Sequence, residues 1–300
     1  MPTSGLPAKH GAGLHLGPFF MTNTKSERIL RPTRGLVSVN LGELWRFREL
    51  LGLLAWRDVL VRYKQTYLGV LWAVLQPVLT MVIFSVLFGR LAKFESWGAP
   101  YAVLVLAGLL PWQFFASALS ESSNSLVASA RIISKVYFPR LIIPMSAVLG
   151  GVLDLLIATG VLLVMMPIYD VAFRPHLLLL PLFFLAAFLP ALAAGIWFSA
   201  LNVKYRDVRY VVPFITRLGM YATPVGFLWQ TLLPPTDTWR WLFHLNPLVG
   251  PIDGFRWCVL GDKFVPWWPG FLMSIGISVV MLVAGLIYFR RVERTFADIV

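Results

Sequence analysis

Residues 124–144 read NSLVASARIISKVYFPRLIIP, and a long apolar stretch lies on each side of them. A loop this short between two membrane spans can hardly fold alone, but it can form one small helix lying across the membrane surface. We expect its cations to face water and its apolar side chains to face protein or lipid. The cations are Arg131, Lys135 and Arg140, and the apolar side chains are Ile132, Ile133, Val136 and Phe138. A partner protein that binds such a helix could move both attached spans. Alternatively, the loop is basic only because cytoplasmic loops of membrane proteins carry an excess of lysine and arginine.

The composition is that of a polytopic helical membrane protein. Of the 300 residues, 58% are hydrophobic and only 13% are charged, whereas soluble domains carry about a quarter charged residues. The net charge of +12 suggests nucleic-acid binding, but the cations sit in the gaps between apolar runs rather than on one face, so we expect no nucleic-acid partner. The single cysteine, Cys258, excludes a disulfide within the chain, and the four histidines lack the spacing of metal ligands.

Hydropathy predicts an all-α fold with six membrane spans, each near the roughly 20 residues that a bilayer requires. The expected spans are residues 68–88, 102–121, 141–166, 177–201, 211–229 and 269–289. Most of the 26 lysines and arginines fall on one side of this arrangement, together with both termini. The positive-inside rule therefore places both termini, and the loop at 124–144, in the cytoplasm.

The segments before the first span are polar or amphipathic. Residues 1–40 lack apolar periodicity and are expected to form a disordered cytoplasmic tail, with Met21 as an alternative start to Met1. Residues 41–55 alternate apolar and charged positions at helical spacing, which predicts a helix at the membrane interface or, alternatively, a soluble packing helix. Three cations then precede the first span, namely Arg57, Arg62 and Lys64.

The connection at residues 229–268 differs from the other loops. It is rich in proline and tryptophan, and its centre is too apolar for an exposed loop yet too interrupted for another span. We expect two short re-entrant helices that dip into the outer leaflet, broken at Asn246–Pro247 and at Pro251. The alternative is two amphipathic helices lying on the membrane.

The sequence contains neither the phosphate loop of an ATPase nor the signatures of serine hydrolases and zinc proteases. Asp154 and Arg217 are expected inside spans, where a charge requires a partner or a wet pathway. They could pair with each other, or Arg217 could pair with Glu121, and either pair could be purely structural. Several aromatic residues could line a passage for sugars, although their positions alone favour a role in packing: Trp112, Phe114, Phe115, Trp197 and Phe198.

An ordered set of motifs resembles the permease subunits of ABC-2 type polysaccharide exporters, and most strongly those for lipopolysaccharide O-antigen; capsule and teichoic-acid exporters are related. The motifs are Arg57-Asp58 with Arg62-Tyr63-Lys64, LGVLWAVLQP at 68–77, GLLPWQFF at 108–115, KVYFPRLIIP at 135–144, NVKYRDV at 202–208 and NPLVGPIDGFRW at 246–257. The likeness covers about residues 41–294.

The resemblance implies a homodimer in the bacterial inner membrane with two cytoplasmic ATPase subunits. These subunits would hold the ATP and magnesium, so that this chain is not an enzyme and needs no cofactor. The implied substrate is a polysaccharide on a polyprenyl-diphosphate lipid that enters from the inner leaflet. The alternatives are an ATP-independent flippase or secondary carrier, for which paired broken spans would be expected, and a membrane glycan ligase, for which the few external carboxylates are too scattered.

The resemblance also implies roles for particular residues. Coupling to the ATPase would involve Ser134, Lys135, Val136, Tyr137, Phe138, Pro139 and Arg140, together with Tyr205, Arg206 and Asp207. The lipid diphosphate would enter near Arg57, Arg62 and Lys64. The channel or intramembrane polar positions would be Asp154, Arg217, Glu121, Trp112 and Phe115, and the outer gate would include Trp241, Asn246, Pro247, Pro251 and Trp257.

Overall fold

The computed structural model describes residues 41–64, 69–232 and 237–293, and within them every regular element is a helix. The expected tail at residues 1–40 lies outside this part. The elements are α1 (Leu41–Arg46), α2 (Arg48–Lys64), α3 (Gly69–Phe84), η1 (Ser85–Leu91), α4 (Tyr101–Ala128), α5 (Ala130–Ile133), α6 (Ile142–Ile168), η2 (Pro175–Leu179), α7 (Leu180–Lys204), α8 (Val208–Ala222), α9 (Trp229–Leu232), α10 (Asp237–His244), α11 (Val249–Leu260), η3 (Asp262–Phe264) and α12 (Trp268–Glu293).

Five helical segments of the described chain are long and apolar enough to cross a membrane. They are Leu71–Leu91, Tyr101–Ala128, Ile142–Ile168, Pro175–Lys204 and Trp268–Glu293. Each coincides with a predicted span to within a few residues at most ends. The exception is the far end of the second span, where α4 continues through Ala128. The all-helical multi-pass fold is therefore confirmed.

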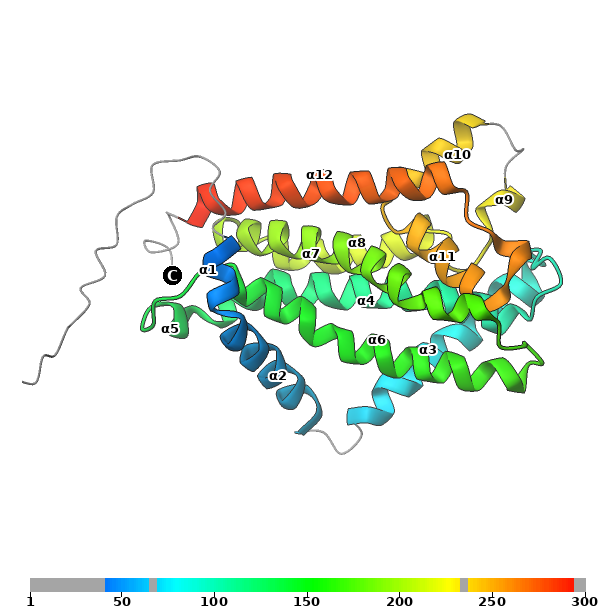
Figure 1. Ribbon diagram of the computed structural model, residues 1–300, viewed down its shortest axis with the longest axis horizontal. Coiled ribbons are helices and arrows are strands. Elements are labelled where there is room, and N and C mark those ends of the chain that lie inside the picture. Colours follow the sequence, from blue (N-terminus) through cyan, green and yellow to red (C-terminus); the bar gives the residue numbers. More distant parts are fainter. Residues whose placement is uncertain (1–40, 65–68, 233–236, 294–300) are drawn as a thin grey trace, which may run out of the picture. The chain divides into compact units, whose positions relative to one another are not determined.

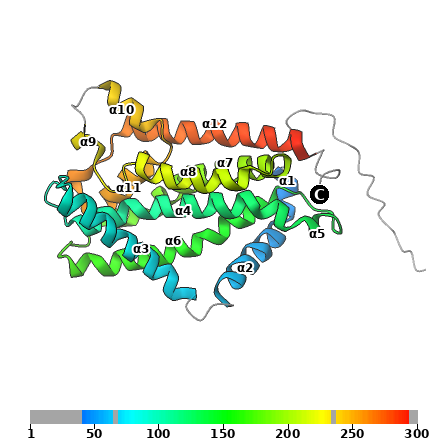
Figure 2. The ribbon, with the colours of Figure 1, turned by 180° about the vertical axis from the view of Figure 1, so that it is seen from behind.

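Helix α4 is the centre of this bundle. It runs between α6 and α7, with α3 and α11 also against it (Figures 1 and 2). Most of its apolar stretch is buried by protein, whereas the other four spans are mostly open to their surroundings. Small residues permit this close packing, since Gly195 of α7 faces Ser122 and Gly151 of α6 faces the Phe114 ring.

The predicted interface helix at residues 41–55 is two helices in the structure. A turn at Phe47 separates α1 from α2, and α2 continues to Lys64. The cations expected just before the first span therefore lie on α2 itself. One face of these helices packs on a buried cluster through Leu44, Phe47, Leu50, Leu51 and Leu54, while Trp45, Leu53 and Trp56 remain exposed. This two-sided pattern fits a helix at a membrane interface.

The predicted span at residues 211–229 is not one continuous helix. Helix α8 ends at Ala222, and Thr223 takes an extended conformation. Proline explains the end, because Pro224 disfavours the helical region for the residue before it and offers no N–H to continue the ladder. The irregular stretch 223–228 that follows is largely buried.

The loop at residues 124–144 is also shorter than predicted, because its first five residues belong to α4. Helix α5 is a single turn, and residues 134–141 form turns. Ile133 and Phe138 face the protein as expected. Ile132 and Val136, in contrast, are exposed.

Gly254 of α11 provides a test of this packing. A Cβ atom there would overlap the Phe183 ring of α7, so Gly254→Ala should destabilise the fold by about 1–3 kcal/mol. Gly276→Ala in α12 is the matched control, because a Cβ there meets nothing within 4 Å. Thermal unfolding in nanodiscs, followed by tryptophan fluorescence, measures both. Equal melting temperatures for the two variants would contradict the close contact of α11 with α7.

Candidate functional site

Two loops meet at the end of the bundle that carries α5, here called the α5 end. One loop joins α4 to α6, and the other joins α7 to α8 (Figure 1). Asn202, buried near the end of α7, donates hydrogen bonds to the Ser123 carbonyl at 2.9 Å and to Asn124 Oδ1 at 3.2 Å. A side chain therefore joins α4 to α7 close to where the two loops predicted to contact an ATPase begin.

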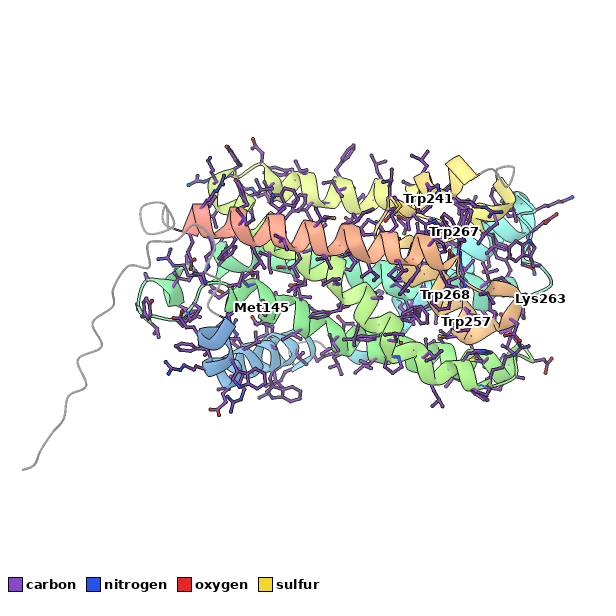
Figure 3. The ribbon with its side chains drawn as sticks, turned by 45° about the horizontal axis from the view of Figure 1, so that its top comes forward. Met145, Trp241, Trp257, Lys263, Trp267 and Trp268 are labelled. Carbon is purple, nitrogen blue, oxygen red and sulfur yellow. The ribbon has the colours of Figure 1, made fainter. Side chains whose placement is uncertain are left out.

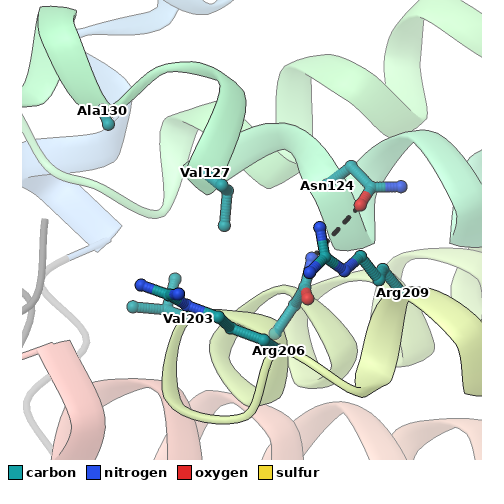
Figure 4. Close-up of a pocket in the computed structure, with 7 residues that line it drawn as sticks. Asn124, Val127, Ala130, Val203, Arg206 and Arg209 are labelled. Atoms are coloured by element: carbon teal, nitrogen blue, oxygen red, sulfur yellow. Dashed lines mark hydrogen bonds between the residues drawn. The ribbon is translucent and has the colours of Figure 1, made fainter.

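A hollow of about 410 Å³ opens between these loops. Val127 and Ala130 lie across it from Val203 and Arg206, and Arg209 also lines it (Figure 4). The walls are thus apolar on the α4 side and basic on the α8 side. Such a hollow can accept an apolar or acidic segment of a partner protein.

The two loops beside this hollow, with the helix ends next to them, are strongly basic. Their exposed cations are Arg131, Lys135, Lys204, Arg206 and Arg209, and Asp207 is the acidic residue among them. Ser134, Val136, Tyr137 and Tyr205 are exposed beside them. We call these exposed residues, together with the hollow, the docking face.

Three of the predicted coupling residues are held by the protein itself. Phe138 and Pro139 are buried. The Arg140 guanidinium donates a 2.7 Å hydrogen bond to the Glu293 carbonyl at the end of α12. These residues fasten the loop to the bundle, whereas residues 134–137 remain free to be touched by a partner.

Arg62 on α2 is the centre of a second polar site. It pairs with Asp154 of α6 and, at 3.3 Å, with Glu121 of α4, and the Tyr63 hydroxyl donates to Asp154. Burial, together with this hydrogen bond, raises the pKa of Tyr63 above its ordinary value. The expected pairing of Asp154 or Glu121 with Arg217 is therefore wrong: both carboxylates face Arg62, and Arg217 is exposed on α8.

The other predicted entrance and channel residues are separated. Arg57 pairs with its neighbour Asp58 at 2.8 Å, and Lys64 is exposed at the end of α2. Trp112 is only 4% exposed and packs over Gly219 of α8 and beside the Phe115 ring. In a single protomer Trp112 is thus a packing residue.

The predicted outer-gate residues gather at the opposite end of the bundle. Trp241 lies against Trp267, and Trp257 lies against Trp268 (Figure 3). Asn246 caps the start of α11 by accepting from the Leu248 N–H, and it donates to Thr223. The break between α10 and α11 at 245–248 is confirmed.

Pro251 does not break α11, contrary to prediction. It lies in the first turn of that helix, where a missing N–H costs little.

A buried polar cluster on α11 was missed by sequence reasoning. Arg256 is 0% exposed and donates to the Val225 carbonyl at 2.8 Å. Asp253 is also buried and accepts from the Trp229 indole at 2.9 Å. An Asp and an Arg three residues apart on an otherwise apolar helix were the available signal.

Comparison with known proteins adds to this geometry. Residues 49–260 match the family described as ABC-2 type transporter. The chain is 31% identical to the O-antigen export system permease protein RfbA of Klebsiella pneumoniae, covering 87% of this chain and 97% of the relative. It is 27% identical to the protein of the same name from Myxococcus xanthus, over 85% and 97% of the two chains. The polysialic acid transport protein KpsM of Escherichia coli is 24% identical over 79% of this chain and 91% of its own.

Asp154→Asn tests the junction around Arg62. The substitution removes the charge that draws Arg62 and Tyr63 toward α6, so the attachment of α2 should weaken by about 1–3 kcal/mol. Hydrogen exchange of the α2 amides should rise accordingly. Asp170→Asn, at an exposed site beyond α6, is the control and should leave α2 unchanged. Unaltered exchange in Asp154→Asn would show that Arg62 does not hold α2 in place.

Proposed function

Because the chain belongs to the ABC-2 type transporter family, we propose that it is the membrane-spanning permease subunit of an ATP-driven exporter of O-antigen type polysaccharide. The observation that carries this proposal is the likeness, over nearly the full length of the relatives, to permeases named for O-antigen export. The substrate would be carried on a polyprenyl-diphosphate lipid from the cytoplasmic leaflet to the outer side of the membrane.

The docking face would receive the ATPase subunit. Its clustered cations favour a partner with an acidic surface, and electrostatic complementarity of this kind steers association. The hollow beside them offers an apolar wall for an inserted side chain. In the proposed complex the ATPase holds ATP and magnesium and performs the hydrolysis, while this chain converts the motion into passage of the glycan.

The proposed assembly is a homodimer with two ATPase subunits in the bacterial inner membrane. Each protomer would cross six times, with α8 and the buried stretch 223–228 together forming the fifth crossing. The basic α5 end would face the cytoplasm under the positive-inside rule, with both termini on that side. Helix α3 exposes Leu79, Val82 and Ile83, which a second protomer or lipid would cover.

The outer end would supply the gate. Helix α11 is buried almost throughout, between α4, α7 and α12, which favours a re-entrant helix over one lying on the membrane. Trp241 is 43% exposed and remains available to the passing glycan. At the other end, Lys64 would attract the lipid diphosphate, since the charges of Arg57 and Arg62 are already matched by carboxylates.

Tyr137→Ala tests the docking face. Tyr137 is 70% exposed, so its loss should leave folding intact but reduce ATPase-dependent export by about tenfold, the effect of one lost contact of about 1.4 kcal/mol. Glycan export and ATP hydrolysis are measured on the complex reconstituted in liposomes. Phe138→Asp is the weaker test, because that buried side chain also supports the fold.

The control is Tyr169→Ala, the same substitution at the opposite end of α6. Normal coupled export by Tyr137→Ala would argue against residues 134–137 as the ATPase contact. Glycan transport by the purified chain without any ATPase would overturn the proposed function itself.

Trp241→Ala tests the outer gate. Removing the indole leaves the Trp267 ring uncovered and widens the outer end, so the export rate should change several-fold while the dimer persists. Size-exclusion chromatography with light scattering reports the oligomer, and liposome transport reports the rate. Loss of the dimer with no separate effect on transport would assign Trp241 to assembly instead.

A further inference from the structure

A groove of about 400 Å³ surrounds the Arg62 cluster and is lined by residues of α2, α3, α4 and α6. Its size falls at the lower end of the roughly 300–1,000 Å³ typical of ligand pockets. Asp154 lies near the middle of α6, so the groove reaches into the part of the bundle that the membrane surrounds. Polar atoms at such depth mark functional sites more often than structural ones.

The charges in the groove do not favour an anion. Arg62 is the lining cation, and it faces two carboxylates, Asp154 and Glu121. The Tyr63 hydroxyl donates to Asp154 and so adds no positive charge. The groove as a whole therefore carries about one net negative charge, which repels a phosphate or diphosphate group.

Three polar side chains that line the groove are not hydrogen-bonded within the described residues. Gln76 of α3, and Gln113 and Ser117 of α4, line it. Within residues 41–64, 69–232 and 237–293, the side chains of these three residues make no hydrogen bond, although the Gln76 backbone carbonyl accepts one from the Thr80 hydroxyl. Amides and hydroxyls removed from water cost free energy unless they are paired, so a ligand rich in hydroxyl groups would satisfy them.

Aromatic surfaces complete the groove. Trp72 of α3 is 53% exposed, and Phe114 of α4 forms part of the wall. An indole face offers a flat apolar surface with a polar edge. Planar amides and carboxylates beside an aromatic face match a sugar ring, whose faces carry C–H groups and whose rim carries hydroxyls.

We propose that this groove binds an uncharged sugar ring attached to a lipid. The inference rests on the proposed function, because the exported glycan is one source of such a ring, and a glycolipid of the membrane is the other. Trp72 stacks on the ring, Gln76 and Gln113 hold its hydroxyls, and the carboxylates around Arg62 accept from them. The diphosphate of a lipid-linked glycan then lies outside the groove.

The experiment uses the full-length chain in phosphatidylcholine nanodiscs and three photoreactive probes. Dodecyl glucoside carrying a diazirine on its sugar represents the ring, and dodecyl phosphate and phosphatidylethanolamine with the same diazirine represent other headgroups. The glucoside should label peptides of α3, α4 and α6 around the groove. Gln113→Leu should reduce this labelling by about tenfold, the effect expected from one lost hydrogen bond of about 1.4 kcal/mol.

Gln230→Leu, the same change near the opposite end of the bundle, should leave the labelling intact. Equal labelling of the groove by the phosphate or phosphatidylethanolamine probe would overturn the proposal, as would undiminished labelling of Gln113→Leu. Competition by purified lipid-linked glycan, but not by a membrane glycolipid, identifies the exported substrate as the source of the ring. Coupled export with an unlabelled groove would overturn the groove alone, whereas a labelled groove without ATP-dependent export would overturn the proposed function alone.

Discussion

The close packing of α4 against α6 and α7 is the interaction on which the rest of the structure depends. In a bilayer, lipid tails are as apolar as leucine, so helices associate through shape and polar contacts rather than through exclusion from water. Gly195 supplies the shape, because it lets α7 approach Ser122 of α4. The Ser122 hydroxyl in turn donates to the Pro144 carbonyl of α6 at 3.2 Å, so one residue of α4 contacts both neighbours.

This packing has a consequence for the docking face. Helix α4 continues without a break from the buried core to Ala128, directly before α5. Phe138 and Arg140 fasten the other side of the loop to the bundle and to the end of α12. A force applied at Tyr137 therefore reaches α4, α6 and α12 together, which is what a connection between an ATPase and a set of spans requires.

Hydropathy and proline positions determined what the sequence could predict. The five long spans, the two short outer helices and the exposed basic loop follow from patterns within single segments. The partner of Asp154 could not be predicted from such patterns. Arg62 and Asp154 are 92 residues apart, and only the packing of α2 on α6 brings them together. The burial of Arg256 was missed for the same reason: its burial depends on α4 and on the stretch 223–228, which no local pattern of α11 describes.

The irregular stretch 223–228 after α8 can be buried because side chains of other elements donate hydrogen bonds to its backbone carbonyls. The Tyr101 hydroxyl donates to the Gly226 carbonyl, and Arg256 donates to the Val225 carbonyl. Asn246 secures the side chain of Thr223. Any opening of the outer end that separates α11 from this stretch must replace these hydrogen bonds with water or with polar groups of the glycan, since lipid offers no substitute. Separating α11 from this stretch would therefore cost free energy in an empty membrane, and polar groups of a bound substrate would lower that cost.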